Sequence, residues 1–186
     1  MRKDIFTPKR KNYIEVGEIY FWTATIHQWQ RLLSKDEFIQ IVLNSLIYLS
    51  ESGKVDVFAF VIMPNHIHII WRIKELNGKE TVQASFLKFS AHEFKKRLLL
   101  YNKNELENYK INASNKSYEF WQRDSLAIHL YTEKVANQKL DYIHYNPCAK
   151  HWALVKDPAD YIYSTAKFYM SGEKNYSFIK DLRNEF

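Results

Sequence analysis

"VDVFAFVIMPNHIHIIWRIK", residues 55–74, is the segment from which the architecture of this chain follows most directly. Residues 55–63 are almost continuously apolar, and residues 66–74 are rich in isoleucine around two histidines. Apolar runs of this length, separated by turn-forming residues such as Pro64 and Asn65, are typical of paired strands. The segment therefore predicts a β-hairpin, and its scarcity of polar residues predicts strands that are covered on both faces.

The residues on either side of the hairpin supply the remaining elements of an α+β fold. In chain order, the patterns predict a strand over 18–27, a helix over 34–53 with Ser34 as N-cap and Gly53 at its end, the two hairpin strands, a helix over 81–102, a strand within 120–132, and a helix over 133–146 with Thr132 as N-cap. This β-α-β-β-α-β order is that of the ferredoxin-like fold, an antiparallel sheet with two helices on one face. The helix over 133–146 is an additional C-terminal element.

Length and composition predict a single domain over residues 1–186. The chain is 46% hydrophobic and 16% aromatic, which is enough to build a core of normal size. We expect a core over about 15–170, a basic N-terminal arm over 1–14, an exposed polar insertion over 104–119 and a peripheral C-terminal tail over 171–186.

The charged residues and the single cysteine narrow the partners and the compartment. Lys and Arg number 27 against 21 Asp and Glu, and the resulting formal charge of +6 favours a polyanionic partner such as nucleic acid. Cys148 is the single cysteine, which excludes an internal disulfide and a multi-cysteine zinc site and favours the reducing cytoplasm. No signal peptide and no apolar run of membrane-spanning length is visible, so we expect neither export nor a membrane partner.

Two histidines stand on the same face of the second hairpin strand. Side chains alternate across a strand, so His66 and His68 face one way while Ile67, Ile69 and Trp71 face the other, toward the two helices. Neighbouring imidazoles on one face can bind one divalent metal through their ring nitrogens. The alternative is that both are half-buried histidines whose hydrogen bonds are satisfied locally.

The helix over 133–146 carries a second pair of polar side chains. Tyr142 and Asn146 are four residues apart and share one helix face, next to an apolar stripe of Ala136, Leu140 and Ile143. If this stripe packs across the histidine face, Asn146 supplies a third, oxygen ligand and Tyr142 points at a phosphate held by the metal. The alternative is a helix end at which the tyrosine belongs to the core and the asparagine is a cap before Pro147.

Three segments together carry a family resemblance. "MPNHIHII" (63–70), "FWQRD" (120–124) and "LDYIHYNPCAKHWALVKDPADYIYSTAKFY" (140–169) resemble segments of the single-tyrosine HUH transposases, most closely the REP-associated tyrosine transposases. The resemblance covers residues 15–170 in the right order. The insertion over 104–119 departs from the family, as does "NPCAKHWALV", where relatives more often have Asn-Pro-Val-x-x-Gly-x-Val.

The resemblance implies an enzyme that cleaves and rejoins single-stranded or hairpin DNA on a ferredoxin-like fold. By position, His66 and His68 are implied to bind a divalent metal, Mg²⁺ or Mn²⁺, with Asn146 as the additional metal-side group. Tyr142 is implied to be the nucleophile, which would form a 5′-phosphotyrosine intermediate and leave a free 3′-hydroxyl. Both a homodimer and a monomer are compatible with the resemblance, as is catalysis within one subunit or between two.

Cationic side chains supply much of the affinity for nucleic acid, because they neutralise phosphates. The candidate nucleic-acid-binding residues are Arg72, Lys88, Arg123, Lys139, Lys150 and, as a surface on which bases stack, Trp121. The alternative is that much of this charge is solvated surface and that the tryptophan packs in the core.

Two other functions are compatible with the same residues. One is a catalytically idle, domesticated regulator that binds DNA or RNA hairpins without cutting them. The other is a metal-dependent hydrolase that uses water, for which the tyrosine is dispensable. A covalent protein–DNA adduct distinguishes the transposase-like enzyme from both.

Overall fold

The computed structural model describes residues 14–113, 116–123 and 125–186 and contains a four-stranded sheet in the order β2-β3-β1-β6. The strands are β1 (Ile19–Thr25), β2 (Val55–Met63), β3 (His66–Ile73) and β6 (Leu126–His129). Every neighbouring pair is antiparallel, and β2 and β3 form the predicted hairpin. The predicted ferredoxin-like α+β arrangement is therefore confirmed.

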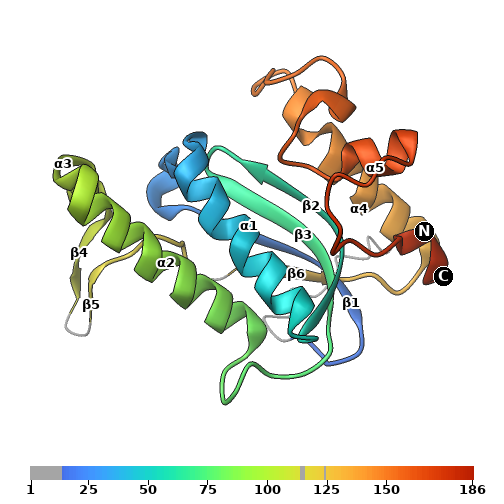
Figure 1. The fold of residues 1–186 in the computed structure, drawn as a ribbon, viewed down its shortest axis with the longest axis horizontal. Coiled ribbons are helices and arrows are strands. Elements are labelled where there is room, and N and C mark those ends of the chain that lie inside the picture. Colours follow the sequence, from blue (N-terminus) through green and yellow to red (C-terminus); the bar gives the residue numbers. More distant parts are fainter. Residues whose placement is uncertain (1–13, 114–115, 124) are drawn as a thin grey trace, which may run out of the picture.

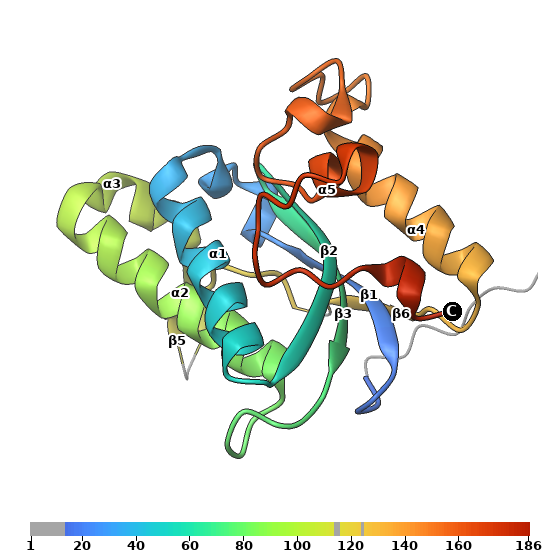
Figure 2. The same cartoon turned by 45° about the vertical axis from the view of Figure 1, so that its right-hand side comes forward.

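Helices cover both faces of this sheet. One face is covered by α1 (Asp36–Glu51) and α2 (Val82–Tyr101), and the other by α4 (Glu133–Tyr145) and the short α5 (Ala166–Ser171), as Figures 1 and 2 show. Ile67, Ile69 and Trp71 of β3 pack in the cluster under α1 and α2, whereas Ile70 packs in the cluster that contains Ile143 of α4. The predicted alternation of side chains along β3 is confirmed.

Helix capping agrees with the sequence at one predicted position and disagrees at another. Thr132 caps α4, since its hydroxyl accepts a hydrogen bond from the Val135 amide at 3.3 Å. The prediction of Ser34 as the N-cap of α1 is wrong, because Ser34 closes the short 3-10 turn η2 (Leu32–Ser34) and α1 begins after Lys35. Leu32 of this turn is buried in the core, and the turn precedes the first residue of the helix, Asp36.

The segment that connects α2 to β6 is more ordered than an exposed polar insertion. It contains α3 (Lys103–Leu106), the 3-10 turn η3 (Glu107–Tyr109) and a separate two-stranded sheet of β4 (Lys110–Ala113) and β5 (Lys116–Tyr118). Leu106 and Tyr109 are buried, and the Tyr109 ring stacks on Phe120 with the ring centroids 4.6 Å apart. The predicted exposure of the insertion is therefore wrong for Leu106 and Tyr109, which pack in the core, whereas its other described residues are exposed or partly exposed.

The C-terminal segment packs on the sheet and is not peripheral as predicted. Ile179 and Leu182 are buried, and the Lys180 amide donates to the Val57 carbonyl at 2.9 Å beside β2. The turns η5 (Pro158–Asp160) and η6 (Leu182–Asn184) belong to this C-terminal part of the chain. Residues 1–13 of the predicted basic arm lie outside the described residues.

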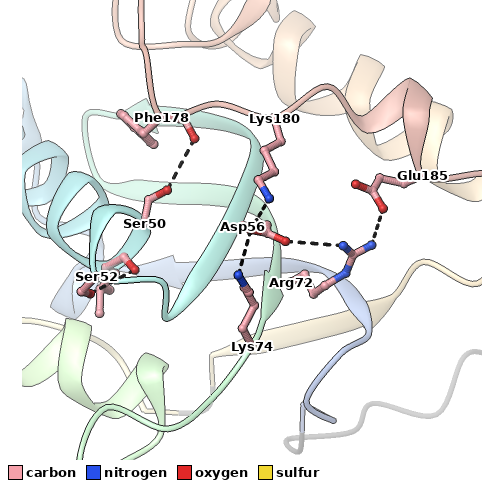
Figure 3. A network of polar contacts seen from close by, with 9 residues as sticks. Ser50, Ser52, Asp56, Arg72, Lys74, Phe178, Lys180 and Glu185 are labelled. Atoms are coloured by element: carbon pink, nitrogen blue, oxygen red, sulfur yellow. Dashed lines mark hydrogen bonds and ion pairs between the residues drawn. The ribbon is translucent and has the colours of Figure 1, made fainter.

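Ion pairs attach the same segment to β2 and β3. Asp56 lies 2.8 Å from Lys180, 3.4 Å from Arg72 and 4.0 Å from Lys74, and Arg72 also pairs with Glu185 (Figure 3). Because Asp56 is largely buried, the surrounding cations compensate its charge. Within the described part of the chain, no helix has the combined length and hydropathy needed to cross a membrane.

Candidate active site

His66 and His68 are oriented by hydrogen bonds to their Nδ1 atoms. His66 Nδ1 lies 2.7 Å from Asn65 Oδ1, and His68 Nδ1 lies 2.7 Å from the Thr23 hydroxyl on the neighbouring strand. The Asn65 oxygen can only accept, so His66 carries its proton on Nδ1 and keeps the Nε2 lone pair available. The two ring centroids are 4.6 Å apart, which brings the imidazoles to one place on the sheet.

Burial keeps both imidazoles neutral at physiological pH. Burial, and to a smaller extent the nearby His151, lowers the pKa of His66 to about 4. Burial also lowers the pKa of His68 well below its ordinary value, with smaller contributions from His66 and Lys139. The neutral imidazole is the form that binds a metal, so the site is prepared for this role without losing protons first.

Helix α4 packs across the histidine face as its apolar stripe predicts. Ala136, Leu140 and Ile143 are buried together with residues of β1, β2 and β3. This docking places the half-exposed Tyr142 ring 5.1 Å from the His68 ring, at an interplanar angle of 64°. Tyr142 is thus a wall of the site and not a residue of the core.

The side chain of Asn146 completes the group. It follows α4, in the 3-10 turn η4 (Asn146–Cys148), and its Nδ2 lies 3.5 Å from His68 Nε2. Its Oδ1 is buried and has no hydrogen-bond partner, which is costly for an amide oxygen. A half-turn of the amide exchanges Oδ1 with Nδ2, so a cation at the Nε2 atoms would give this oxygen the partner it lacks. The donor set therefore fits a divalent metal.

Without the Asn146 oxygen, the site would offer a metal only the two imidazoles. Among the described residues, no group of three or more His, Cys, Asp or Glu side chains is arranged to hold a metal. Two imidazoles and one amide carry no negative charge, so a bound divalent cation would keep its full charge for an anionic ligand such as a phosphate.

These four side chains line a cleft of about 790 Å³. The lining also contains residues that were not among the predicted site residues, including Trp29, Tyr145, His151 and Trp152. Trp152 lies 5.8 Å from the His66 ring and 5.7 Å from the Arg31 guanidinium. The only sequence signal for His151 and Trp152 is that "KHW" departs from the family pattern after Asn-Pro.

The predicted nucleic-acid contacts divide into two groups. Lys139 lines the cleft, with its ammonium 5.1 Å from the Phe21 ring and 5.6 Å from the Tyr142 ring. Lys150 is exposed and directly precedes His151 in the chain. Lys150 and the remaining predicted cations do not line the cleft, and three of these cations form ion pairs elsewhere: Arg72 with Asp56 and Glu185, Lys88 with Glu80, and Arg123 with Glu119.

The prediction of Trp121 as a stacking surface is wrong. Trp121 is buried among the aromatic side chains between the sheet and α2, where its ring lies 5.8 Å from Phe94. Its indole nitrogen donates to the Ser90 hydroxyl at 2.9 Å. Because both its face and its polar atom are occupied inside the protein, this tryptophan serves packing.

The fold is similar to that of a tyrosine transposase, as a comparison with solved structures shows. The structure of a REP-associated tyrosine transposase bound to a REP hairpin matches 95% of this chain and 99% of its own, with a TM-score of 0.61 and 19% sequence identity. In sequence, the chain is 25% identical over 150 residues to a Haemophilus influenzae protein that carries the provisional name of REP-associated tyrosine transposase, covering 80% of each. No family model matches the chain. The resemblance to the REP-associated tyrosine transposases is confirmed.

Proposed function

We propose that this protein is a metal-dependent DNA nicking and strand-transfer enzyme of the transposase kind. In this proposal it cleaves and rejoins single-stranded or hairpin DNA through a covalent link to Tyr142. The observation that supports it is the meeting of His66, His68, Tyr142 and Asn146, from distant parts of the sequence, in one cleft. Hairpin DNA is the preferred substrate class because the solved transposase of the same fold is bound to a REP hairpin.

His66, His68 and Asn146 would hold the divalent cation, Mg²⁺ or Mn²⁺. A divalent cation bound to a phosphate neutralises charge on its oxygens, which makes the phosphorus more electrophilic. The protein itself orients the donors, since Asn65 and Thr23 fix the two imidazole rings. These contacts occupy both Nδ1 atoms, so the Nε2 atoms are the ones available to a metal.

Tyr142 would act as the nucleophile. Its hydroxyl oxygen forms a bond to phosphorus while the bond from phosphorus to the 3′-oxygen breaks, and the departing oxygen takes up a proton as the 3′-hydroxyl. The reverse step, with a 3′-hydroxyl as nucleophile, rejoins a strand and regenerates the phenol without an external energy source. The Lys139 ammonium, 5.6 Å from the Tyr142 ring, is placed to stabilise negative charge on the phenol or to contact a phosphate.

The deciding experiment traps the covalent intermediate. Labelled hairpin DNA with a single-stranded tail is incubated with the protein and Mn²⁺, resolved on a denaturing gel, and the modified peptide is mapped. Wild type should give an adduct on Tyr142, and Tyr142→Phe should give none while it keeps its fold and its DNA binding. Tyr145→Phe is the matched control, because Tyr145 is similarly exposed and lines the same cleft.

The outcome separates the candidate functions. An adduct that persists in Tyr142→Phe, or that maps to Tyr145, contradicts the assignment of the nucleophile. Metal-dependent cleavage without any adduct favours a hydrolase that uses water. DNA binding with neither cleavage nor adduct favours the idle hairpin-binding regulator.

A further inference from the structure

The turn after β1 presents a tryptophan in an unusual backbone conformation. Gln28 and Trp29, inside the 3-10 turn η1 (His27–Trp29), have φ angles of 49° and 58°. Residues other than glycine, asparagine and aspartate seldom adopt positive φ, and bulky ones least of all. The Trp29 side chain is nevertheless 61% exposed, so burial of the indole does not compensate the strain.

Contacts from the hairpin turn hold Trp29 in place. The Asn65 side-chain amide donates to the Trp29 carbonyl at 3.3 Å, and the Ile26 amide donates to the Asn65 carbonyl at 2.8 Å. The Oδ1 atom of the same Asn65 side chain accepts the hydrogen bond from His66 Nδ1. One residue thus fixes both the tryptophan turn and the first imidazole of the site, so their relative position is set.

The other tryptophan of the cleft is engaged within the protein. Trp152 is only partly exposed and lies against the Arg31 guanidinium and the His66 ring. Trp29 differs because its ring is mostly exposed at the cleft that also contains His66 and Tyr142. The backbone of Trp29 is held by Asn65, and its flat, apolar ring is exposed at the cleft, which suits a flat, apolar ligand group.

We infer that Trp29 is a base-stacking residue that receives an unpaired nucleobase next to the phosphate bound at the histidine pair. The inference rests on the proposed function and adds to it the part of the substrate that this side chain contacts. Stacking on an indole face requires a base that is free of its own neighbours, as in a single strand or a hairpin tail. It also tolerates all four bases, so Trp29 would position the strand without selecting its sequence.

The test measures DNA binding without catalysis. A fluorescent DNA hairpin with a single-stranded tail of about ten nucleotides is titrated in the presence of EDTA, and an abasic residue is moved along the tail. Trp29→Asn removes the ring while keeping a residue that tolerates positive φ, and Trp29→Phe keeps a smaller ring. Tyr48→Ala is the control, because Tyr48 is 62% exposed and lies on α1, on the other face of the sheet.

We expect Trp29→Asn to weaken binding about 5- to 150-fold, the range measured for loss of one stacked base. One abasic position should weaken binding by wild type and leave binding by Trp29→Asn unchanged, because the same contact is already missing. Trp29→Phe should restore part of the affinity and the sensitivity to that position, and Tyr48→Ala should bind as wild type does.

Two results overturn the inference. If Trp29→Asn binds as tightly as wild type and shows the same response to every abasic position, the stacking role is wrong while the proposed function stands. If wild type binds no hairpin or single-stranded DNA, both fail together. The stacking role is also contradicted if Trp29→Asn and Trp29→Phe lower the affinity for DNA equally at every position of the abasic residue. The phenyl ring would then bind DNA no better than the asparagine side chain.

Discussion

At the scale of single residues, the candidate site depends on three side chains with no net charge. His66 and His68 are buried and uncharged at neutral pH, and the amide oxygen of Asn146 lacks a partner. A divalent cation that binds the folded protein and not the unfolded chain stabilises the fold by mass action. The metal can therefore be detected without any DNA.

We expect Mn²⁺ to raise the melting temperature of wild type and to leave that of His68→Ala unchanged. The reason is that removal of one of two imidazoles leaves too few donors to hold the ion. His129→Ala is the control, because His129 is partly exposed and pairs with Glu18. Thermal unfolding with and without EDTA measures the effect, and an equal metal shift in His68→Ala would contradict the assignment of this ligand.

The same measurement has a defined pH window. An ordinary histidine has a pKa of about 6.5, whereas burial holds the pKa of His66 at about 4. Protons therefore compete with the metal at His66 only as the pH falls toward 4. The rise in melting temperature caused by Mn²⁺ should still be present at about pH 5. The metal-free protein loses stability over this range, because the unfolded chain takes up protons at the ordinary pKa and the folded chain does not. The melting temperatures with and without Mn²⁺ are therefore compared with each other at each pH.

Sequence reasoning at this scale succeeded where one local pattern fixed the direction of a side chain. Alternation along β3 put His66 and His68 on one face, and the four-residue spacing put Tyr142 of α4 and Asn146, directly after this helix, on the side that meets His68. It failed for the tryptophans, because exposure depends on segments far away in the chain. Trp121 is buried by α2, whereas Trp29 remains at the cleft.

At the scale of elements, the C-terminal segment contributes to the packing of the helix that carries Tyr142. Leu182 is 1% exposed and belongs to the same cluster as Leu140 and Ile143 of α4. We expect Leu182→Ala to lower the free energy of unfolding by about 2–4 kcal/mol, from lost burial and the cavity that remains. Chemical denaturation measures this loss.

A matched substitution separates this packing from a general effect of removing an apolar side chain. Ile162→Ala is suitable, because Ile162 is largely exposed and its removal should change the free energy of unfolding by less than about 0.5 kcal/mol. Equal stability of Leu182→Ala and wild type would show that the C-terminal segment does not support the fold.

Elements with complete local signals were predictable, and elements that depend on distant partners were not. The hairpin has its turn residues, and α4 has Thr132 as its cap, so both follow from short segments. The pairing of Ile179 with Val57 joins residues far apart in the sequence and has no local signature. Leu106 and Tyr109 sit in a polar segment, and only the neighbouring core explains their burial.

At the scale of the whole molecule, the positive charge and the cleft give a prediction about binding. The formal charge is +6, and Lys139 lies at the cleft. Because phosphate contacts release counterions, we expect affinity for hairpin DNA to fall linearly with salt on a double-logarithmic plot. Lys139→Gln should reduce the slope by about one unit, which fluorescence titrations over a series of salt concentrations would measure.

Lys88→Gln is the control for that slope, because Lys88 pairs with Glu80 and does not line the cleft. It should leave the slope unchanged. A salt-independent affinity for hairpin DNA in wild type would contradict nucleic acid as the partner, whatever the outcome at Lys139.

The position of β3 inside the sheet has a consequence for molecules that are damaged or only partly folded. β3 is hydrogen-bonded along its length to both β1 and β2, whereas α4 reaches the sheet through packed side chains. Local unfolding releases the least strongly held elements first, so α4 would detach while the histidine strand stays in place. In such a molecule His66 and His68 stay in place, but Tyr142 has moved away from them. Under the proposed function, a partly unfolded molecule of this kind would bind the metal but form no covalent adduct with DNA.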